Sequence, residues 1–261
     1  MANNVKKVWA SGKAVVNAWL AIPSGFSAEV IAQCGFDSVT VDMQHGVQDY
    51  LSMVQCFQAM NGHPVTPMVR VPWNEPGIIG KVLDGGAYGV ICPMVNTRED
   101  AQKLVAYTRY PPRGVRSYGP LRAMLYGGAD YLEHANDTIV VSAMIETAQA
   151  LENLDSILSV EGLDAIYVGP SDLSLAFGCK PAFEDVEPPV AQAIQHIVDR
   201  AKAHRVVPGI HTSGAEGALM RIGMGFQFVT LSSDARILAA ASQAQVAKVR
   251  GVKAAAGSKS Y

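Results

Sequence analysis

Two carboxylates, Glu146 and Asp172, have the clearest chemical potential in the sequence. Glu146 directly follows an apolar run that ends at Ile145, and Asp172 follows the next such run, which ends at Val168. One strand–helix unit separates them, so two neighbouring strand ends could direct both carboxylates at one ion. Two hard oxygen ligands suit Mg²⁺ or Mn²⁺ and leave coordination positions for substrate and water. The alternative is that each acid only caps the helix that follows it.

His45 is the candidate for acid–base catalysis. It lies three residues after Asp42, whose carboxylate could orient the imidazole and set its tautomer. An ordinary polar loop residue is the alternative. Arg70 lies near the end of another apolar run, which begins at Thr66. An arginine in that position is expected to pair with a carboxylate, either of a ligand or of the protein.

Lysines are absent from the ends of the apolar runs. They fall in segments of helical spacing, before the first run, after the sixth run or in the C-terminal tail. A lysine that forms a Schiff base with a carbonyl substrate is therefore disfavoured. Activation of a carbonyl group would then come from a metal ion or from hydrogen-bond donors.

Eight short apolar runs, rich in β-branched residues, alternate with segments of helical spacing. Near-continuous apolar runs are typical of parallel strands that are covered on both faces. Because no glycine-rich Rossmann motif follows the first run, the pattern favours a single (β/α)8 TIM barrel, of the α/β class. We expect the barrel domain over residues 1–252 and a flexible tail over residues 253–261. The predicted strands are Val15–Ile22, Ser38–Asp42, Thr66–Val71, Gly89–Met94, Ile139–Ile145, Ala165–Val168, Val206–Ile210 and Phe228–Leu231.

Active sites of such barrels form at the C-terminal ends of the strands. Charged and polar residues gather at these predicted ends, and charged ends on buried strands are costly unless they have a use. The residues at the predicted strand ends include Trp19, Asp42, His45, Arg70, Asn96, Glu146, Asp172, His211, Ser232 and Asp234.

The composition excludes several classes of protein. The 261 residues are 49% hydrophobic and 17% charged, with a net charge of −2, which gives no general attraction for nucleic acid or anionic membranes. The N-terminus lacks the apolar stretch of a signal peptide, and no apolar run is long enough to span a bilayer. The 4 cysteines are scattered without a Cys-x-x-Cys pair. We expect reduced thiols in a cytoplasmic protein.

The segment from Arg109 to Arg122 interrupts the alternation of strands and helices. It contains four arginines and three prolines and no acidic residue. Two interpretations stay open at this stage. The segment could be a solvated or oligomer-contact loop, or it could guard an anionic substrate.

Taken together, these residues resemble the HpcH/HpaI group of class II, metal-dependent pyruvate aldolases. The resemblance extends from about Ala18 to Asp234, and its motifs are weak singly but specific in this order and spacing. They are Val41-Asp-Met-Gln-His45, Val69-Arg-Val-Pro-Trp-Asn-Glu-Pro76, Leu83-Asp-Gly-Gly86, Pro93-Met-Val-Asn96, Arg109-Tyr-Pro-Pro-Arg-Gly-Val-Arg116, Ile145-Glu146 and Val168-Gly-Pro-Ser-Asp-Leu173.

The resemblance implies an activity: reversible cleavage of a 4-hydroxy-2-oxo acid to pyruvate, or hydroxypyruvate, and an aldehyde. The reaction passes through an enolate stabilised by a divalent ion such as Mg²⁺, Mn²⁺ or Co²⁺. Glu146 and Asp172 are then the metal ligands. Arg70 polarises the 2-oxo group, and His45, held by Asp42, is the acid–base residue.

The resemblance also implies contacts beyond these residues. Backbone amides near Ser171 and His211 are expected to hold the substrate carboxylate, with Trp19 also at the substrate. Asp84 corresponds to a family position that acts near the site, either within its own chain or across a subunit contact. The implied assembly is a homo-hexamer, built as a trimer of dimers.

Two positions depart from the family pattern. Gln44 stands beside the base where the family commonly has Glu, which removes a negative charge near His45. His211 stands where the aldolases carry an apolar residue. A polar ring there could contact a hydroxylated donor such as hydroxypyruvate or the aldehyde, or it could be an ordinary barrel-end histidine. The identity of the donor stays open.

Two rival functions are considered. The chain could be a lyase of the citrate lyase β-subunit type, which acts on a CoA thioester. It could also be a catalytically silent barrel with a binding or assembly role. The joint presence of Arg70, His45, Glu146 and Asp172 argues against a silent barrel.

Overall fold

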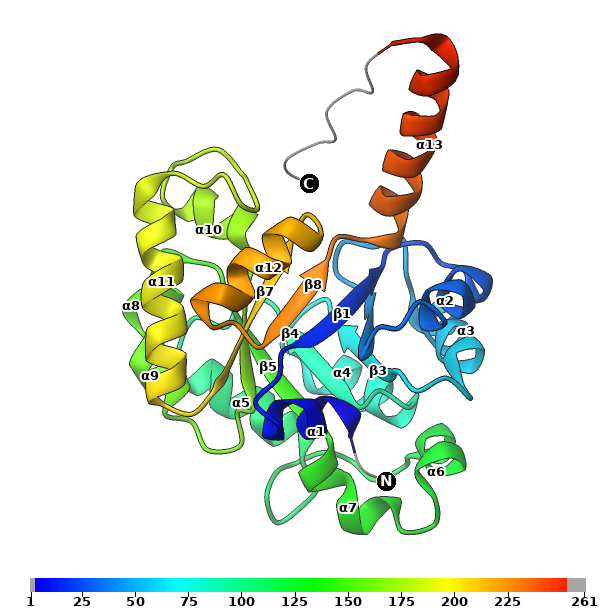
Figure 1. Ribbon diagram of the computed structural model, residues 1–261. Coiled ribbons are helices and arrows are strands. Elements are labelled where there is room, and N and C mark those ends of the chain that lie inside the picture. The colour runs from blue at the N-terminus through cyan, green and yellow to red at the C-terminus, as the bar shows by residue number, and fades with distance from the viewer. Residues whose placement is uncertain (1–2, 253–261) are drawn as a thin grey trace.

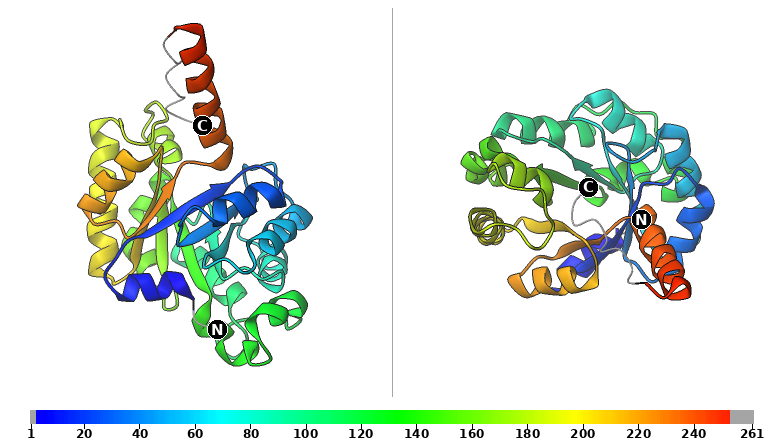
Figure 2. Two further views of the ribbon diagram at one scale, coloured as in Figure 1. Left: turned by 45° about the vertical axis from the view of Figure 1, so that its right-hand side comes forward. Right: turned by 90° about the horizontal axis from the view of Figure 1, so that it is seen from above.

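Eight parallel strands close into a barrel in the order of the chain, as predicted. The computed structural model describes residues 3–252, and the tail predicted over residues 253–261 lies outside them. Helices surround the barrel, which Figure 2 shows from above. The strands are β1 (Val15–Leu20), β2 (Ser38–Asp42), β3 (Thr66–Arg70), β4 (Gly89–Cys92), β5 (Val140–Ile145), β6 (Ala165–Val168), β7 (Val207–Thr212) and β8 (Phe228–Leu231).

Helices connect consecutive strands and cover the outside of the barrel (Figure 1). Apolar residues on the outer strand faces pack against them in one large cluster. The helices are α1 (Asn4–Ala10), α2 (Gly25–Ala32), α3 (Tyr50–Met60), α4 (Pro76–Asp84), α5 (Arg98–Thr108), α6 (Leu121–Gly127), α7 (Tyr131–Thr138), α8 (Ala148–Glu152), α9 (Leu154–Leu158), α10 (Pro170–Ala176), α11 (Pro188–Ala203), α12 (Ala215–Met224) and α13 (Asp234–Arg250).

A second cluster fills the inside of the barrel. Alternate residues of each strand point inward, so the interior is built in layers of side chains. The buried apolar members are Val5, Val15, Trp19, Met68, Ile91, Val140, Met144, Tyr167 and Phe228. The barrel is therefore a packed core, and ligands can bind only at its ends.

The end formed by the strand N-termini is closed. Helix α1 lies across it, with Val5 buried in the inner cluster and the Trp9 ring 5.9 Å from that of Phe228. The Asn3 side chain donates to the carbonyls of Tyr88 and Thr138, both at 2.9 Å. Helices α6 and α7 lie at this same end (Figure 1). The opposite end, where the strands have their C-termini, is the mouth.

Strand β3 ends one residue earlier than predicted, at Arg70, and two other strands end two residues earlier, each for a local reason. Strand β1 ends at Leu20 and not at Ile22, because the Ile22 amide donates to the Asp234 carboxylate at 3.3 Å and not to a neighbouring strand. Strand β4 ends at Cys92, before Pro93, which has no N–H to contribute to a ladder.

Helix α13 differs from the other long helices in its packing. It projects away from the barrel beyond the mouth (Figures 1 and 2), and only Asp234 and Ala247 are buried along it. Several of its apolar side chains are exposed, among them Leu238 at 60% and Val249 at 88%. No helix within residues 3–252 combines the length and the apolar character needed to cross a membrane.

Candidate active site

The topmost inward-pointing side chains of the strands form the floor of the mouth. They are Trp19 of β1, Asp42 of β2, Arg70 of β3 and His211 of β7, together with Glu146, directly after β5. All five are buried, at 2% or 3% exposure. The structure thus brings together five of the ten strand-end residues named from the sequence, and Asp172 lies in the first turn of α10.

Asp42 and Arg70 form a bidentate ion pair on this floor. The two residues are register partners of β2 and β3, and Arg70 donates from Nε at 2.8 Å and from Nη2 at 2.7 Å. The Arg70 guanidinium also lies over the Trp19 ring at 4.8 Å. Burial alone would raise the pKa of Asp42, but the hydrogen bonds and charge of Arg70 bring that pKa below its usual value. The carboxylate expected to pair with Arg70 is therefore that of Asp42, a residue of the protein, and not that of a ligand.

Glu146 is a buried carboxylate held by a backbone amide. Its Oε1 accepts from the Met94 amide at 2.8 Å, and Met94 has the left-handed φ of 56°. This conformation is unfavourable for a residue with a side chain and is typical of functional sites. Desolvation, followed by the nearby charge of Asp172, raises the pKa of Glu146 to about 7 despite the Met94 amide and Arg70. Helix α8 is capped by Thr147, so Glu146 is not a helix cap.

Two features fit the site for a divalent ion beside Glu146 and Asp172. A side chain at Gly169 would place a Cβ 2.7 Å from Oε2 of Glu146, so the glycine leaves room for the carboxylate. The buried Ser171 hydroxyl has no hydrogen-bond partner among the described residues. Within residues 3–252, no three His, Cys, Asp or Glu side chains form a metal cluster. The two carboxylates would thus need further oxygen ligands from substrate and water.

His45 lies on an exposed turn at the rim of the mouth. Asp42 Oδ1 accepts from the backbone amides of Gln44 at 3.1 Å and His45 at 3.3 Å. Gly46 closes the turn where a Cβ would lie 2.3 Å from the Asp42 carbonyl oxygen. Asp42 therefore positions His45 through the backbone while it also binds Arg70.

His211 lies inside β7 and not beyond it. The strand continues to Thr212 because His211 pairs in register with Thr230 of β8. The imidazole packs edge-on against Trp19, with ring centroids 5.2 Å apart, and its Nδ1 is 3.1 Å from the Tyr167 hydroxyl. Burial, followed by the charge of Arg70, lowers the pKa of His211 to about 3, so the ring is neutral.

Asp84 and the arginine-rich segment lie at the opposite end of the barrel. Asp84 ends α4, just before β4, and its carboxylate is bound by Arg116 at 2.7 Å. Arg109 donates to the Ile139 carbonyl at 3.0 Å. The interpretation that this segment guards the substrate of its own chain is wrong, because a segment between a helix and the next strand lies at the strand N-termini. A single chain does not bring Asp84 to its own mouth.

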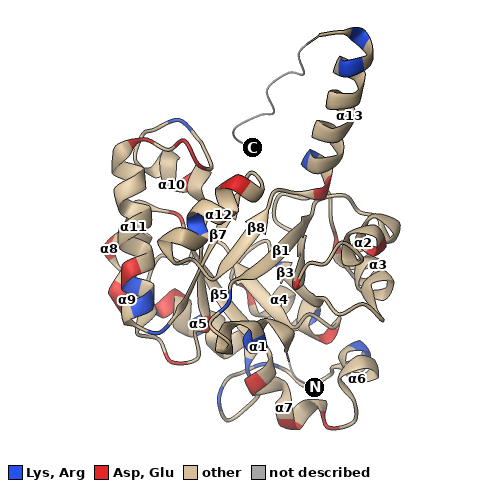
Figure 3. Cartoon of the chain, viewed as in Figure 1, with Lys and Arg blue, Asp and Glu red and all other residues tan. Residues whose placement is uncertain are grey.

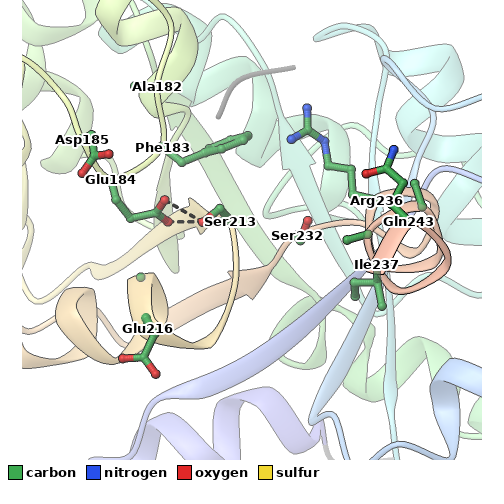
Figure 4. Close-up of a pocket in the computed structure, with 13 residues that line it drawn as sticks. Ala182, Phe183, Glu184, Asp185, Ser213, Glu216, Ser232, Arg236, Ile237 and Gln243 are labelled. Carbon is green, nitrogen blue, oxygen red and sulfur yellow. Dashed lines mark hydrogen bonds between the residues drawn. The ribbon is translucent and has the colours of Figure 1, made fainter. Parts of the chain in front are cut away.

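A pocket of about 700 Å³ opens beside the mouth, between the segment before α11 and the first turns of α13 (Figure 4). Phe183 and Arg236 face it from opposite sides, and Glu184 accepts from the amide and hydroxyl of Ser213, each at 2.7 Å. The Phe183 ring lies 5.2 Å from that of His211. No motif in the sequence indicates this pocket, because its residues come from segments far apart in the chain.

Comparison with known proteins establishes the family. The family model described as HpcH/HpaI aldolase/citrate lyase matches residues 16–252. The chain belongs to this family. It is accordingly a carbon–carbon lyase of the aldolase type, and the resemblance inferred from the motifs is confirmed.

Relatives of this HpcH/HpaI protein match over nearly their full length. A hydroxypyruvate/pyruvate aldolase of Rhizorhabdus wittichii is 40% identical over 96% of this chain and 100% of its own. A 5-keto-4-deoxy-D-glucarate aldolase of Escherichia coli is 38% identical over 92% of this chain and 94% of its own. The structure of an HpcH/HpaI aldolase/citrate lyase family protein from Burkholderia cenocepacia matches with a TM-score of 0.90 and 29% identity, over 95% of this chain and 100% of that one.

Proposed function

We propose that this protein is a divalent-metal-dependent aldolase that reversibly cleaves 4-hydroxy-2-oxo acids to pyruvate, or hydroxypyruvate, and an aldehyde. The observation that carries the proposal is the grouping of Glu146, Asp172 and Arg70 at the mouth. The charge of Asp172 raises the pKa of Glu146, and the charge of Arg70 lowers it. The names of relatives at 37–40% identity favour an aldolase over a lyase of the citrate lyase β-subunit type.

In this proposal Glu146 and Asp172 hold the ion, which is Mg²⁺, Mn²⁺ or Co²⁺. When bound, the ion supplies positive charge that stabilises negative charge on the 2-oxo oxygen. Arg70, whose plane is fixed by Asp42, donates a hydrogen bond to the same oxygen. The amides near Ser171 and His211, with the Ser171 hydroxyl, bind the carboxylate.

His45 takes the proton of the 4-hydroxyl group, directly or through water. The C3–C4 bond then breaks, its electron pair moves toward C3 and C2, and the aldehyde leaves. Return of a proton to C3 of the enolate gives pyruvate, or hydroxypyruvate where C3 carries a hydroxyl group. Gln44 and Trp19 flank the reacting atoms.

We also propose that the protein works as a homo-hexamer, a trimer of dimers, in which Asp84 of one copy lies near the mouth of another. The exposed apolar residues of α13 support an assembly, because a second copy would cover them. A cytoplasmic location is supported by the four cysteines, all of which are free thiols. Positive and negative side chains are interspersed over the chain (Figure 3), which favours small-molecule substrates over nucleic acid or a membrane surface.

The decisive experiment measures pyruvate release from a racemic, free 4-hydroxy-2-oxo acid. Activity should disappear with EDTA and return with Mg²⁺ or Mn²⁺. Activity that ignores the chelator would contradict the role of Glu146 and Asp172. Cleavage that requires a CoA thioester would instead support the lyase of the citrate lyase β-subunit type.

A further inference from the structure

The turn after β4 is hydrogen-bonded to the segment after β5 at three places. The Met94 amide donates to Glu146 Oε1 at 2.8 Å. Two residues further on, the side chains of Asn96 and Thr147 are hydrogen-bonded to each other. The Asn96 carbonyl accepts from Asn153 Nδ2 at 3.0 Å. The orientation of the Glu146 carboxylate therefore depends on the path that the chain takes through this turn.

The turn holds Met94 between two anchored points. On one side, β4 fixes the chain as far as Cys92. On the other side, Asn96 is anchored through its side chain and carbonyl, and its amide donates to Asp100 Oδ2 at 3.2 Å. Val95 between them is fully buried. A left-handed φ such as the 56° of Met94 persists only where the surrounding structure enforces it, and these anchors can enforce it.

The two oxygens of the Glu146 carboxylate have different surroundings. Oε1 accepts from the Met94 amide. Oε2 faces the junction between β6 and α10, since a Cβ at Gly169 would lie 2.7 Å from it. Asp172 lies in the first turn of α10. Oε2 is thus the oxygen that lies toward the element carrying the second carboxylate.

We propose that Asn96 and Thr147 are positioning residues for the metal site, and that their hydrogen bond holds Met94 in its left-handed conformation. The Met94 amide then fixes Glu146 through Oε1 and leaves Oε2 to bind the ion. This inference rests on the proposed function. Hydrogen bonds to a ligating carboxylate set its orientation, and their loss typically weakens metal binding about 10- to 100-fold. Asn96 and Thr147 act on the ion only through Met94 and Glu146.

The effect on Met94 can be tested in metal-free protein. Labelling with ¹⁵N-methionine gives an amide signal for Met94, which is identified by its loss in Met94→Leu. We expect slow hydrogen exchange at this amide in the wild type, since it is bound to a buried carboxylate. In Asn96→Ala the exchange should be about tenfold faster, the size of one lost hydrogen bond. Equal exchange rates in the two proteins would overturn the inference.

The effect on the ion is measured with Mn²⁺, whose EPR signal reports the free ion and gives a Kd without any turnover. Asn96→Ala and Thr147→Val should each bind Mn²⁺ about tenfold more weakly than the wild type. Thr147→Ser keeps the hydroxyl group and should bind it normally. Because both residues act through one hydrogen bond, the double variant should bind no more weakly than Thr147→Val. An unchanged Kd in Asn96→Ala would contradict the assigned role.

Asn136→Ala is the matched control. Asn136 is half-buried, as Asn96 is, but its side chain binds the amide and the carbonyl of Tyr110 at 2.7 and 3.1 Å, at the closed end of the barrel. This variant should change neither the exchange at Met94 nor the Kd for Mn²⁺, and an equal loss of binding would overturn the inference. A wild type that binds no Mn²⁺ would instead contradict the proposed function, while the exchange at Met94 would still decide whether Asn96 holds this turn.

Discussion

Asp42 and Arg70 illustrate how one buried residue depends on another at this site. The Asp42 and Arg70 side chains are 3% and 2% exposed, so both charges are desolvated and each is stabilised by the other. Removing one partner leaves the other charge buried and uncompensated, which is far more costly than losing an ion pair on the surface. The pair therefore stabilises the fold of the mouth as well as orienting Arg70.

Substituting Asp42→Ala should lower the free energy of unfolding by roughly 3–5 kcal/mol, since Arg70 would remain as an unpaired buried cation. Urea unfolding measures this loss. The control is Asp155→Ala, which removes an exposed carboxylate paired with Arg200 and should cost less than about 1 kcal/mol. Similar losses in both variants would contradict the assigned burial of the Asp42–Arg70 pair.

The raised pKa of Glu146 couples metal binding to pH. With its pKa moved from 4.5 to about 7, ionisation of Glu146 is disfavoured in the metal-free folded protein. The stabilisation linked to this group is complete below pH 4.5 and is lost as pH rises through 7. A divalent ion needs the ionised carboxylate, so it must displace a proton at low pH.

The increase in Tm produced by Mg²⁺ or Mn²⁺ should therefore be larger at pH 8 than at pH 5.5. Thermal unfolding of EDTA-treated protein, with and without added metal across this range, measures the effect. In Glu146→Gln both the metal response and its pH dependence should vanish. A metal-induced shift in Tm that does not vary with pH would argue against Glu146 as a ligand.

At the scale of elements, the junction between β6 and α10 controls the space around the carboxylates. Gly169→Ala should weaken metal affinity about tenfold, because the new Cβ would lie 2.7 Å from Oε2 of Glu146 and displace the carboxylate. Metal titration measures this loss. Gly223→Ala is the control: no atom lies within 4 Å of its added Cβ, and alanine favours the exposed helix. Equal metal affinity in both variants would show that Gly169 has no such role.

The order of strands and helices was predictable because each strand is covered on both faces and is therefore almost wholly apolar. Strand ends were less predictable, since they depend on groups brought from elsewhere. The Ile22 amide leaves the ladder for Asp234, which is more than two hundred residues away in the chain. His211 remains in the ladder through its pairing with Thr230, a contact that only the closed barrel creates.

The candidate site was predictable where it consists of side chains at strand ends. It was not predictable where it depends on backbone conformation: the left-handed Met94 presents its amide to Glu146, and nothing in its residue type indicates this. The composition of the arginine-rich segment left two interpretations open, a solvated or oligomer-contact loop and a guard of an anionic substrate, and could not decide between them. The position of the segment between a helix and the following strand does predict its location. Such a segment lies at the N-terminal ends of the strands, so Arg109 and Arg116 lie at the closed end of the barrel.

At the scale of the whole molecule, α13 is the element that a single chain leaves without sufficient packing. The double variant Leu238→Asp and Val249→Asp should shift the protein toward smaller species, because charges on these exposed apolar positions would oppose burial against a second copy. Light scattering coupled to size-exclusion chromatography gives the mass directly. Gln245→Asp adds a charge to a polar position of the same helix and should not change the mass. A wild-type protein that is monomeric would contradict the proposed assembly.

The closure of one barrel end by α1 has a consequence for the kinetic order of the reaction. With Val5 and Trp9 packed into that end, both products have to leave through the mouth. In the proposed mechanism the 2-oxo acid binds on the floor and the aldehyde lies above it, so the aldehyde is expected to depart first. Cleavage should therefore be inhibited competitively by pyruvate, which binds the empty enzyme. The aldehyde, which binds only once pyruvate is in place, should give noncompetitive inhibition.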